Sequence, residues 1–394
     1  MNKQVPTKVN FDNTELAFKA KTDSLLKRTY QLYRLIDSPF LTKIGPPMVQ
    51  GAMKIGLPIE GIVKKTLFDI FCGGESIKDS EATSEQLAKF GVGTILDYSV
   101  EAEKTEKGFD ETLRNILETL EQGARHKEVV FSACKLTGLA SFGLMEAIQA
   151  GENLSPDQES AYARVKERLN AICQKAVESK TPVFIDAEES WIQDTIDGLA
   201  EEMMEKYNQD SAYVYTTIQL YRHDRLAYLA SLIVKSREKG YFPGVKIVRG
   251  AYMEKESARA EEKGYPDPIQ PSKEATHKDF NEAQKLCLQH IDRVFLCAGT
   301  HNEESCYQLM ELMQSQGLSP DDTRVWFSQL LGMSDHISFN LSHAGYNVAK
   351  YVPFGPVRAV IPYLMRRAEE NTAIAGQSSR EVSLLKKEIK RRKL

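Results

Sequence analysis

The segment "PYLMRRAEEN" (residues 362–371) carries two adjacent arginines among other polar side chains. Neighbouring residues of a helix point about 100° apart, so Arg366 and Arg367 can share a partner only if it is small and accepts several hydrogen bonds. A carboxylate meets this condition. Tyr363, Arg367 and Glu370 follow at i, i+4 and i+7. The pattern predicts a carboxylate-binding helix face, and a solvated face with local Arg–Glu pairs is the alternative.

The same segment has a second face, which is apolar. Val357, Ile361, Leu364 and Ala368 recur at the spacing of a buried helix stripe. We therefore expect the polar face to be separate from the core, with a kink at Pro362.

The elements that would position this helix begin near residue 90. Short runs rich in Val, Ile, Phe or Tyr alternate there with longer amphipathic segments. The runs are 92–99, 128–136, 182–189, 213–220, 245–251, 293–301, 324–331 and 347–354. Such alternation, repeated eight times in about 280 residues, predicts an α/β fold that is a (β/α)8 barrel of the TIM type. A doubly wound open sheet is the alternative, because periodicity does not prove closure.

Helix limits can also be predicted. Segments 109–125, 224–240 and 302–317 are amphipathic, and we expect Asp224 and Asn302 to cap the last two.

The two ends of the chain do not follow the alternation. Residues 1–88 are predicted to form an N-terminal helical arm, and residues 89–375 the barrel. Residues 376–394 are predicted to form a basic C-terminal tail with a thin apolar stripe of Val382, Leu385 and Ile389.

The residues at the ends of the predicted strands, where active sites of such barrels lie, are mostly polar. They are Asp97, Glu101, Lys135, Asp186, Glu188, Glu189, Gln219, Arg249, Gly250, Ala251, Tyr252, Thr300, His301, Gln329, Leu330 and Tyr351. A charged group beside a buried strand needs an ionic partner or a ligand. The ring is therefore either a structural ion-pair network or a binding site.

Composition excludes several classes of protein. The net charge of −4 gives no field for nucleic acid. The N-terminus lacks the apolar region of a secretion signal, and the six scattered cysteines indicate reduced, mostly buried thiols in a cytoplasmic protein. The seven histidines show no ligand spacing, so we expect no metal.

Common cofactor motifs are absent from the sequence. "FGVGTI" lacks the third glycine of a dinucleotide fingerprint, and there is no phosphate-binding loop motif. Lys135 could form a Schiff base, but Asp97 or Asp186 nearby would favour its unreactive ammonium form. The residues alone therefore identify no cofactor.

Five segments, in order, resemble those of proline dehydrogenases. They are "KIVRGAYMEKE" (246–256), "GTHN" (299–302), "FSQLLGM" (327–333), "KYVPFG" (350–355) and "YLMRRAEEN" (363–371). "CKLTGL" (134–139) and "DAEE" (186–189) also match, and the resemblance covers roughly residues 85–375. It is nearer to the single-activity enzymes than to the bifunctional ones that add an aldehyde dehydrogenase domain.

The resemblance implies a distorted (β/α)8 barrel that holds FAD without a Rossmann motif. It implies oxidation of L-proline to 1-pyrroline-5-carboxylate, with electrons passed to a membrane quinone and a separate pyrroline-5-carboxylate dehydrogenase downstream. No His or Cys lies in a recognisable attachment context, so we expect the FAD to be noncovalent.

The resemblance also implies roles for individual residues. Lys135, Arg366 and Arg367 would bind the substrate carboxylate, with Asp186 holding Lys135. Tyr351, Tyr363 and Leu330 would wall the substrate ring, and Glu101 would pair with Arg366 as a gate. The expected flavin contacts are Gln219, Lys246, Val248, Gly250, Ala251, Tyr252, Thr300, His301 and Glu370. Lys246 is a departure, because bacterial bifunctional relatives have arginine there.

Three alternatives stay open. A hydroxyproline dehydrogenase is the sister activity, and Tyr351 argues against it because those enzymes have a smaller residue there. A lysine-dependent barrel aldolase would use Lys135. An inactive membrane adaptor would use the basic tail, which in the main hypothesis either docks the enzyme peripherally on the inner face of the membrane or is simply solvated.

Overall fold

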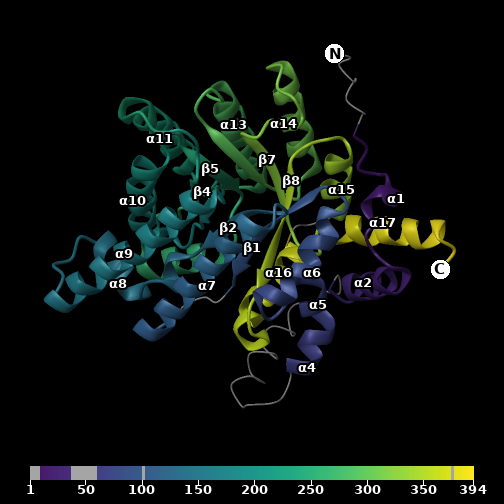
Figure 1. Cartoon of the computed structure of the whole chain (residues 1–394), viewed down its shortest axis with the longest axis horizontal. Helices are drawn as coiled ribbons and strands as arrows, with labels where there is room; N and C mark the ends of the chain where they lie inside the picture. Colours follow the sequence, from purple (N-terminus) through teal and green to yellow (C-terminus); the bar gives the residue numbers. More distant parts are fainter. Residues whose placement is uncertain (1–8, 37–59, 100–102, 374–376) are drawn as a thin grey trace. The chain divides into compact units, whose positions relative to one another are not determined.

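The computed structural model describes residues 9–36, 60–99, 103–373 and 377–394 (Figure 1). Eight strands form a closed parallel barrel in the order β1 to β8, which confirms the predicted barrel and excludes the open sheet. The strands are β1 (Val92–Tyr98), β2 (Val129–Cys134), β3 (Val183–Ile185), β4 (Val214–Gln219), β5 (Gly244–Val248), β6 (Phe295–Gly299), β7 (Val325–Leu330) and β8 (Val348–Phe354). Each overlaps its predicted run.

By compactness the chain divides into two units, with boundaries inside β1 and β7. We call residues 95–328 the barrel unit, and residues 1–94 with 329–394 the terminal unit. Each is described by itself.

The helices of the barrel unit follow the strands in alternation. They are α7 (Glu106–Arg125), the short η2 (Leu136–Gly138), α8 (Phe142–Gln149), α9 (Pro156–Ser179), α10 (Ser190–Tyr207), α11 (Arg225–Lys239), α12 (Met253–Lys263), α13 (Lys273–Gln289) and α14 (Glu303–Ser315). Aromatic side chains fill part of the unit's interior, where Phe131 stacks on Phe184 with ring centroids 4.5 Å apart.

One of the two predicted caps is confirmed and the other is wrong. The Asn302 side chain accepts a hydrogen bond from the Ser305 amide at the start of α14. Asp224 precedes α11 but makes no cap hydrogen bond, because its carboxylate is taken by the Arg222 guanidinium at 2.7 Å. A charge-assisted bidentate pair is stronger than a bond to a backbone amide.

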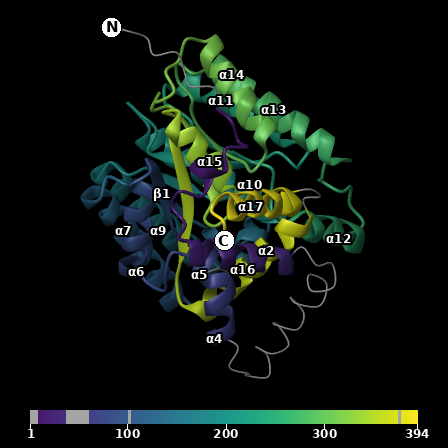
Figure 2. The same cartoon turned by 90° about the vertical axis from the view of Figure 1, so that its right-hand side faces the viewer.

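The terminal unit combines both ends of the chain. Its elements are α1 (Thr14–Ala17), α2 (Asp23–Ile36), α4 (Glu60–Val63), η1 (Lys64–Phe68), α5 (Asp69–Phe71), α6 (Ile77–Ala88), α15 (Asp335–His343), α16 (Val357–Ala373) and α17 (Gln377–Arg391), besides β8. Figure 2 shows α2, α16 and α17 of this unit from a second side.

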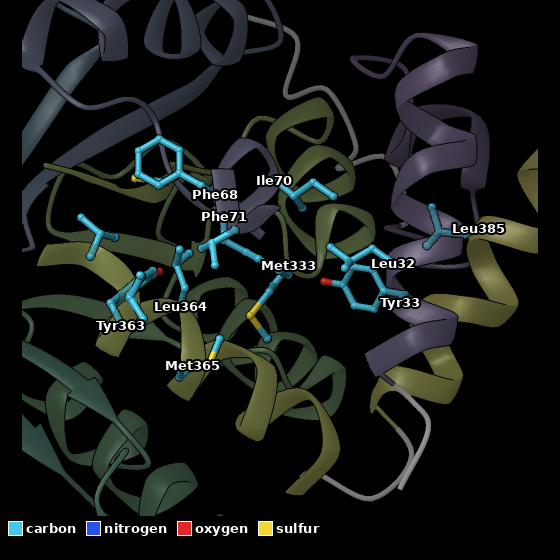
Figure 3. Packing of buried hydrophobic residues seen from close by; sticks show 14 of the residues in the cluster. Leu32, Tyr33, Phe68, Ile70, Phe71, Met333, Tyr363, Leu364, Met365 and Leu385 are labelled. Atoms are coloured by element: carbon cyan, nitrogen blue, oxygen red, sulfur yellow. The ribbon is translucent and has the colours of Figure 1, made fainter. Parts of the chain in front are cut away.

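An apolar cluster drawn from both chain ends forms the core of the terminal unit (Figure 3). It includes Leu32 and Tyr33 of α2, Phe71 of α5, Leu364 of α16 and Leu385 of α17. The burial of apolar area on this scale is the main stabilising term available to such a helix assembly.

The segment predicted as a basic tail is therefore a packed helix. Leu384 and Leu385 of α17 are buried, and α17 packs against α1 and α2. Val382 and Ile389 of the predicted stripe are partly buried against the same cluster. The apolar stripe thus has a partner within the protein.

All six cysteines are buried and none is part of a disulfide, as predicted. Burial raises the pKa of Cys297 to about 11 and that of Cys287 to about 12, so these thiols are protonated at neutral pH.

Candidate active site

The strand register of the barrel unit brings two oppositely charged residues together. Cys134 of β2 pairs with Ile185 of β3, so the residues that follow them, Lys135 and Asp186, lie side by side. The Lys135 ammonium is 3.3 Å from the Asp186 carboxylate. Lys246, from the middle of β5, contacts the other oxygen of that carboxylate. Two lysines therefore share one acid at the carboxyl ends of the strands.

A second acid borders this group. Asp97 of β1 lies 3.9 Å from Lys135 and accepts a hydrogen bond from Ser99. Two carboxylates beside Lys135 favour its ammonium form. An ammonium is a good carboxylate ligand and a poor nucleophile, so the geometry argues against the aldolase alternative.

Glu188 organises the strand ends, a role that the sequence did not reveal. It is fully enclosed and accepts hydrogen bonds from the Thr137 amide, at 3.0 Å, and from the Thr137 hydroxyl. Its carbonyl accepts a bond from the Gln219 side chain at 2.7 Å. Burial raises the pKa of Glu188 to about 7. Glu188 thus joins the ends of β2, β3 and β4, which carry Lys135, Asp186 and Gln219.

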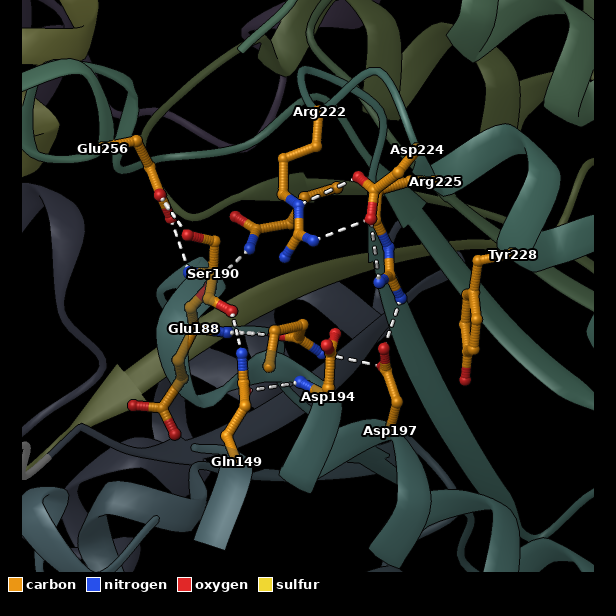
Figure 4. A network of polar contacts seen from close by, with 12 residues as sticks. Gln149, Glu188, Ser190, Asp194, Asp197, Arg222, Asp224, Arg225, Tyr228 and Glu256 are labelled. Atoms are coloured by element: carbon orange, nitrogen blue, oxygen red, sulfur yellow. Dashed lines mark hydrogen bonds and ion pairs between the residues drawn. The ribbon is translucent and has the colours of Figure 1, made fainter. Parts of the chain in front are cut away.

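A polar network supports the start of α10, next to these strand ends (Figure 4). The buried Glu256 carboxylate accepts bonds from the Ser190 amide at 2.6 Å and the Ser190 hydroxyl at 2.5 Å. Arg225 pairs with Asp197 at 2.5 Å. These contacts are internal to the barrel unit and fix the loop that carries Asp186.

Arg249 organises the ends of β5 and β6. Its guanidinium donates to His277 Nδ1 at 2.7 Å, to Thr300 Oγ1 at 2.7 Å and to Ser305 Oγ at 2.9 Å. Burial lowers the pKa of Arg249 to about 10, so it is still a cation at neutral pH. No carboxylate of the described residues pairs with it. Its position at the end of a predicted strand was the signal in the sequence, and His277 gave none.

The residues after Arg249 leave their backbone open. Gly250 is exposed and has φ +134°, and the Tyr221 ring covers the side on which a Cβ would lie, 2.3 Å from that position. Ala251 is exposed and Tyr252 half-buried. A bare, left-handed backbone next to a cation is suited to close approach by a large anionic ligand.

In the terminal unit, two of the predicted substrate residues are neighbours. Leu330 ends β7, and the next amide, that of Leu331, donates to the Tyr351 carbonyl at 2.9 Å. Tyr351 is buried, with 8% of its surface exposed.

Helix α16 contradicts the prediction of a polar face separate from the core, and it excludes the solvated alternative for Arg367. Tyr363 is buried in the apolar cluster, so the polar face is not separate from the core as expected. The reason is that α16 is covered on several sides, with Val360 and Met365 buried as well. Arg367 is also buried, and its guanidinium lies 4.9 Å from the centre of the Tyr363 ring. A solvated face is therefore excluded for Arg367.

Some predicted residues cannot be placed in this way. Glu101 lies outside the described residues, and the side chain of Glu370 is likewise not described. Arg366 and His301 are half-buried, and Thr300 is buried. The structure thus brings Lys135, Asp186 and Lys246 together in one unit, and Tyr363 and Arg367 in the other.

Known proteins match this chain over most of its length. The family model described as proline dehydrogenase matches residues 80–380. Proline dehydrogenase 1, mitochondrial, of Dictyostelium discoideum is 32% identical over 437 residues, which cover 99% of this chain and 76% of that protein. Hydroxyproline dehydrogenase of Xenopus laevis is 29% identical over 412 residues, which cover 95% of this chain and 88% of that one.

A solved structure supports the same conclusion for the fold. The structure of proline utilization A from Bdellovibrio bacteriovorus, inactivated by N-propargylglycine, aligns with a TM-score of 0.72 at 19% identity. The alignment covers 95% of this chain but spans only 40% of that longer chain. The family model and the Dictyostelium relative show that this chain belongs to the proline dehydrogenase family.

Proposed function

We propose that this protein oxidises L-proline to 1-pyrroline-5-carboxylate with noncovalent FAD and passes the electrons to a quinone. The observation that carries the proposal is the pair of lysines on Asp186, one half-buried and one buried, in a chain of this family. Such a cluster offers fixed cations at the strand ends, where ligands of (β/α)8 enzymes bind.

Three features of the barrel unit fit a flavin dinucleotide. Arg249 supplies positive charge that no described carboxylate offsets, and Gly250 and Ala251 supply open backbone. Thr300 is held by Arg249. Gln219, Lys246, Val248, Tyr252, His301 and Glu370 would complete the contacts. When bound, FAD supplies the hydride acceptor for C5 of proline.

The chain's own part in the reaction is to bind and orient the substrate. Lys135, Arg366 and Arg367 would hold the carboxylate, since guanidinium forks and an ammonium are its strongest partners. Asp186 keeps Lys135 in place. Leu330, Tyr351 and Tyr363 would enclose the pyrrolidine ring and exclude water, and Glu101 would close the site through Arg366.

The second candidate function is hydroxyproline oxidation. It is favoured by the similarity to the Xenopus hydroxyproline enzyme, which extends over almost the whole chain. Tyr351 argues for proline, because a buried aromatic ring leaves little room or hydration for an added hydroxyl.

The test is the visible spectrum of the purified protein with and without substrate. We expect flavin peaks that bleach when L-proline is added and respond at least tenfold less to trans-4-hydroxy-L-proline. A colourless protein that stays colourless after incubation with FAD would exclude the proposal. Acid precipitation should release the flavin into the supernatant, whereas flavin in the pellet would mean a covalent bond.

A membrane quinone implies some contact with lipid, which is a separate part of the proposal. Among the described residues, no helix has both the length and the apolar character needed to cross a bilayer. Lys386, Lys390 and Lys393 at the end of the chain are exposed and could bind anionic headgroups. The cytoplasmic location, the quinone and the separate downstream dehydrogenase stay predictions.

Charge reversal tests this contact better than deletion of residues 383–394, because deletion would remove the buried Leu384 and Leu385. Lys386, Lys390 and Lys393 changed to Glu should abolish co-sedimentation with anionic vesicles. The control is the same change at the exposed Lys263, Lys273 and Lys278, which should leave co-sedimentation with the vesicles unchanged. Equal sedimentation of both triple variants would rule out docking through α17.

A further inference from the structure

The loop from β7 to α15, residues 331–334, is held by side chains from three distant segments. The Tyr33 hydroxyl of α2 donates to the Gly332 carbonyl at 2.8 Å. The Glu381 carboxylate of α17 accepts from the Ser334 amide at 2.5 Å. Lys350 of β8 donates to the Leu330 carbonyl at 3.3 Å and to the Met333 carbonyl. Both chain ends therefore bind the backbone of this loop.

The loop needs this support because its backbone is unusual. Gly332 has φ +79°, and a Cβ there would lie 2.5 Å from the Ile70 carbonyl. Ser334 has φ +51°, in the left-handed region that side chains other than glycine disfavour. Such a conformation persists only where the surroundings determine it.

Buried charges strengthen the attachment. Asp335, directly after the loop, lies 2.9 Å from the Lys350 ammonium and 3.0 Å from that of Lys21. Lys350 is fully buried. The Lys21 carbonyl in turn accepts from Arg392 of the last turn at 2.8 Å. The arm and the C-terminal helix are thus connected to the loop through one continuous polar network.

We propose that Tyr33, Lys350, Asp335, Glu381 and Lys21 are positioning residues for the wall of the substrate ring. The loop begins immediately after Leu330, and Lys350 immediately precedes Tyr351 in the chain. The Leu331 amide also donates to the Tyr351 carbonyl. The inference rests on the proposed function, because the roles of Leu330 and Tyr351 come from there.

The consequence is specific. Helices at the two chain ends would set how closely Leu330 and Tyr351 pack on the ring, and so would affect substrate affinity and discrimination. They would have little effect on the chemical step, because none of the five residues is proposed to touch the reacting atoms.

Tyr33→Phe is the sharpest test, because it removes one hydroxyl and keeps the buried ring. Tyr207→Phe is the matched control, since the Tyr207 hydroxyl also makes one bond, to Asn170 at 2.8 Å, but in the barrel unit at the end of α10. Amide hydrogen exchange of residues 331–334 and steady-state kinetics with L-proline and trans-4-hydroxy-L-proline are measured for wild type and both variants.

In Tyr33→Phe we expect exchange of the loop amides to quicken at least fivefold. KM for proline should rise roughly fivefold with kcat within twofold, the effect of one lost buried hydrogen bond. The preference for proline should fall by a similar factor. Tyr207→Phe should change none of these. Glu381→Gln, which keeps an acceptor for the Ser334 amide but removes the charge, repeats the test if Tyr33→Phe does not fold.

The outcomes separate the two proposals. Unchanged exchange in the loop would overturn the positioning role. Faster exchange with unchanged KM and discrimination, in an enzyme that oxidises proline, would overturn the link to the substrate wall. A wild-type enzyme that oxidises neither substrate would refute the proposed function itself, and the link to a substrate wall with it, while the exchange data would still report whether the loop is held.

Discussion

Two clusters of buried charge in this protein differ in what they hold. In the barrel unit, Lys135 and Lys246 contact the Asp186 side chain. In the terminal unit, Lys350 and Glu381 contact backbone groups of the loop at 331–334. The first cluster connects side chains to one another, whereas the second connects side chains both to one another and to the main chain.

Burial alone does not distinguish these clusters. The side chains of Lys135 and Lys246 are 12% and 7% exposed, and those of Lys350 and Asp335 are 0% and 8% exposed. The difference lies in the partners. A lysine that pairs with a carboxylate can exchange part of that interaction for a ligand, whereas a lysine that also holds main-chain carbonyls cannot do so without moving the loop. The first arrangement suits binding and the second suits positioning.

The largest expected effect is the difference between the two clusters when the same Lys→Met substitution is made in each. Lys350→Met should lower the free energy of unfolding by about 3–5 kcal/mol, because it leaves buried carbonyls unbonded and removes one partner of Asp335. Lys135→Met should change stability by less than about 1 kcal/mol, since Lys246 still pairs with Asp186, but should lower kcat/KM at least 30-fold. Urea unfolding and kinetics of both variants test the comparison. If both variants lost the same free energy of unfolding, the two clusters would not differ in their structural role.

The next effect concerns the arginines of α16. Arg366→Met and Arg367→Met should each cost about 2–4 kcal/mol in transition-state binding, or roughly 30-fold to several hundred-fold in kcat/KM. Arg358→Met is the matched control, because Arg358 is an exposed arginine of the same helix. It should change kcat/KM by less than about twofold. A drop below threefold in both test variants would mean that the carboxylate is bound elsewhere.

The sequence was sufficient to predict the barrel, and the reason is physical. Parallel strands buried on both faces are short apolar runs, and each of the eight runs became a strand. The contact between Lys135 and Asp186 was also predictable, because each residue follows one of two consecutive strands. Reasoning of this kind gives the order of the strands and helices along the chain. It also indicates at which end of the barrel a given residue lies.

The network of the terminal unit could not be predicted in this way. Lys21, Tyr33, Asp335, Lys350 and Glu381 come from five separate elements or turns, and no local spacing relates them. Likewise, helical periodicity shows which residues of α16 share a face but not how many neighbours cover it, so Tyr363 was assigned to a polar face although it is buried. Asp224 was assigned to a cap because it begins an amphipathic segment, and the assignment was wrong because Arg222 of the same loop binds its carboxylate.

The pH dependence of stability tests the acid that joins the strand ends of the barrel unit, Glu188. Its pKa of about 7 in the folded state is above its usual value of about 4.3 when unfolded. The folded state therefore binds this proton more tightly, so the stabilisation is present at low pH and is lost as pH rises toward 7. Relative to Glu188→Gln, the wild type should lose about 2 kcal/mol of unfolding free energy between pH 5 and pH 7.

The matching measurement is urea unfolding of both proteins across that pH range. Glu188→Gln keeps an acceptor for the Thr137 amide, so its structure should persist. If the difference in unfolding free energy between wild type and variant did not change with pH, Glu188 would ionise normally. In that case its hydrogen bonds with Thr137, and not its burial, would determine its charge.

The smallest expected effect tests the wall of the substrate ring directly. Tyr351 is buried in the middle of the terminal unit's strand β8, and its carbonyl accepts a hydrogen bond from the Leu331 amide of the loop after Leu330. Crowding of an added hydroxyl, together with loss of its hydration, should cost about 1–3 kcal/mol, or roughly tenfold to over a hundredfold in preference for proline.

Tyr351→Ser should relax that crowding and offer the hydroxyl a partner. Turnover of trans-4-hydroxy-L-proline should then gain relative to L-proline, while proline binding weakens because the aromatic wall is lost. The measurement is kcat/KM for both substrates with an artificial quinone acceptor, with Tyr346→Ser, at another largely buried tyrosine of the same unit, as control. A wild-type preference for hydroxyproline would make hydroxyproline the substrate. An unchanged ratio in Tyr351→Ser would show that Tyr351 does not line the ring, and the positioning role of the loop would then have to act through Leu330 alone.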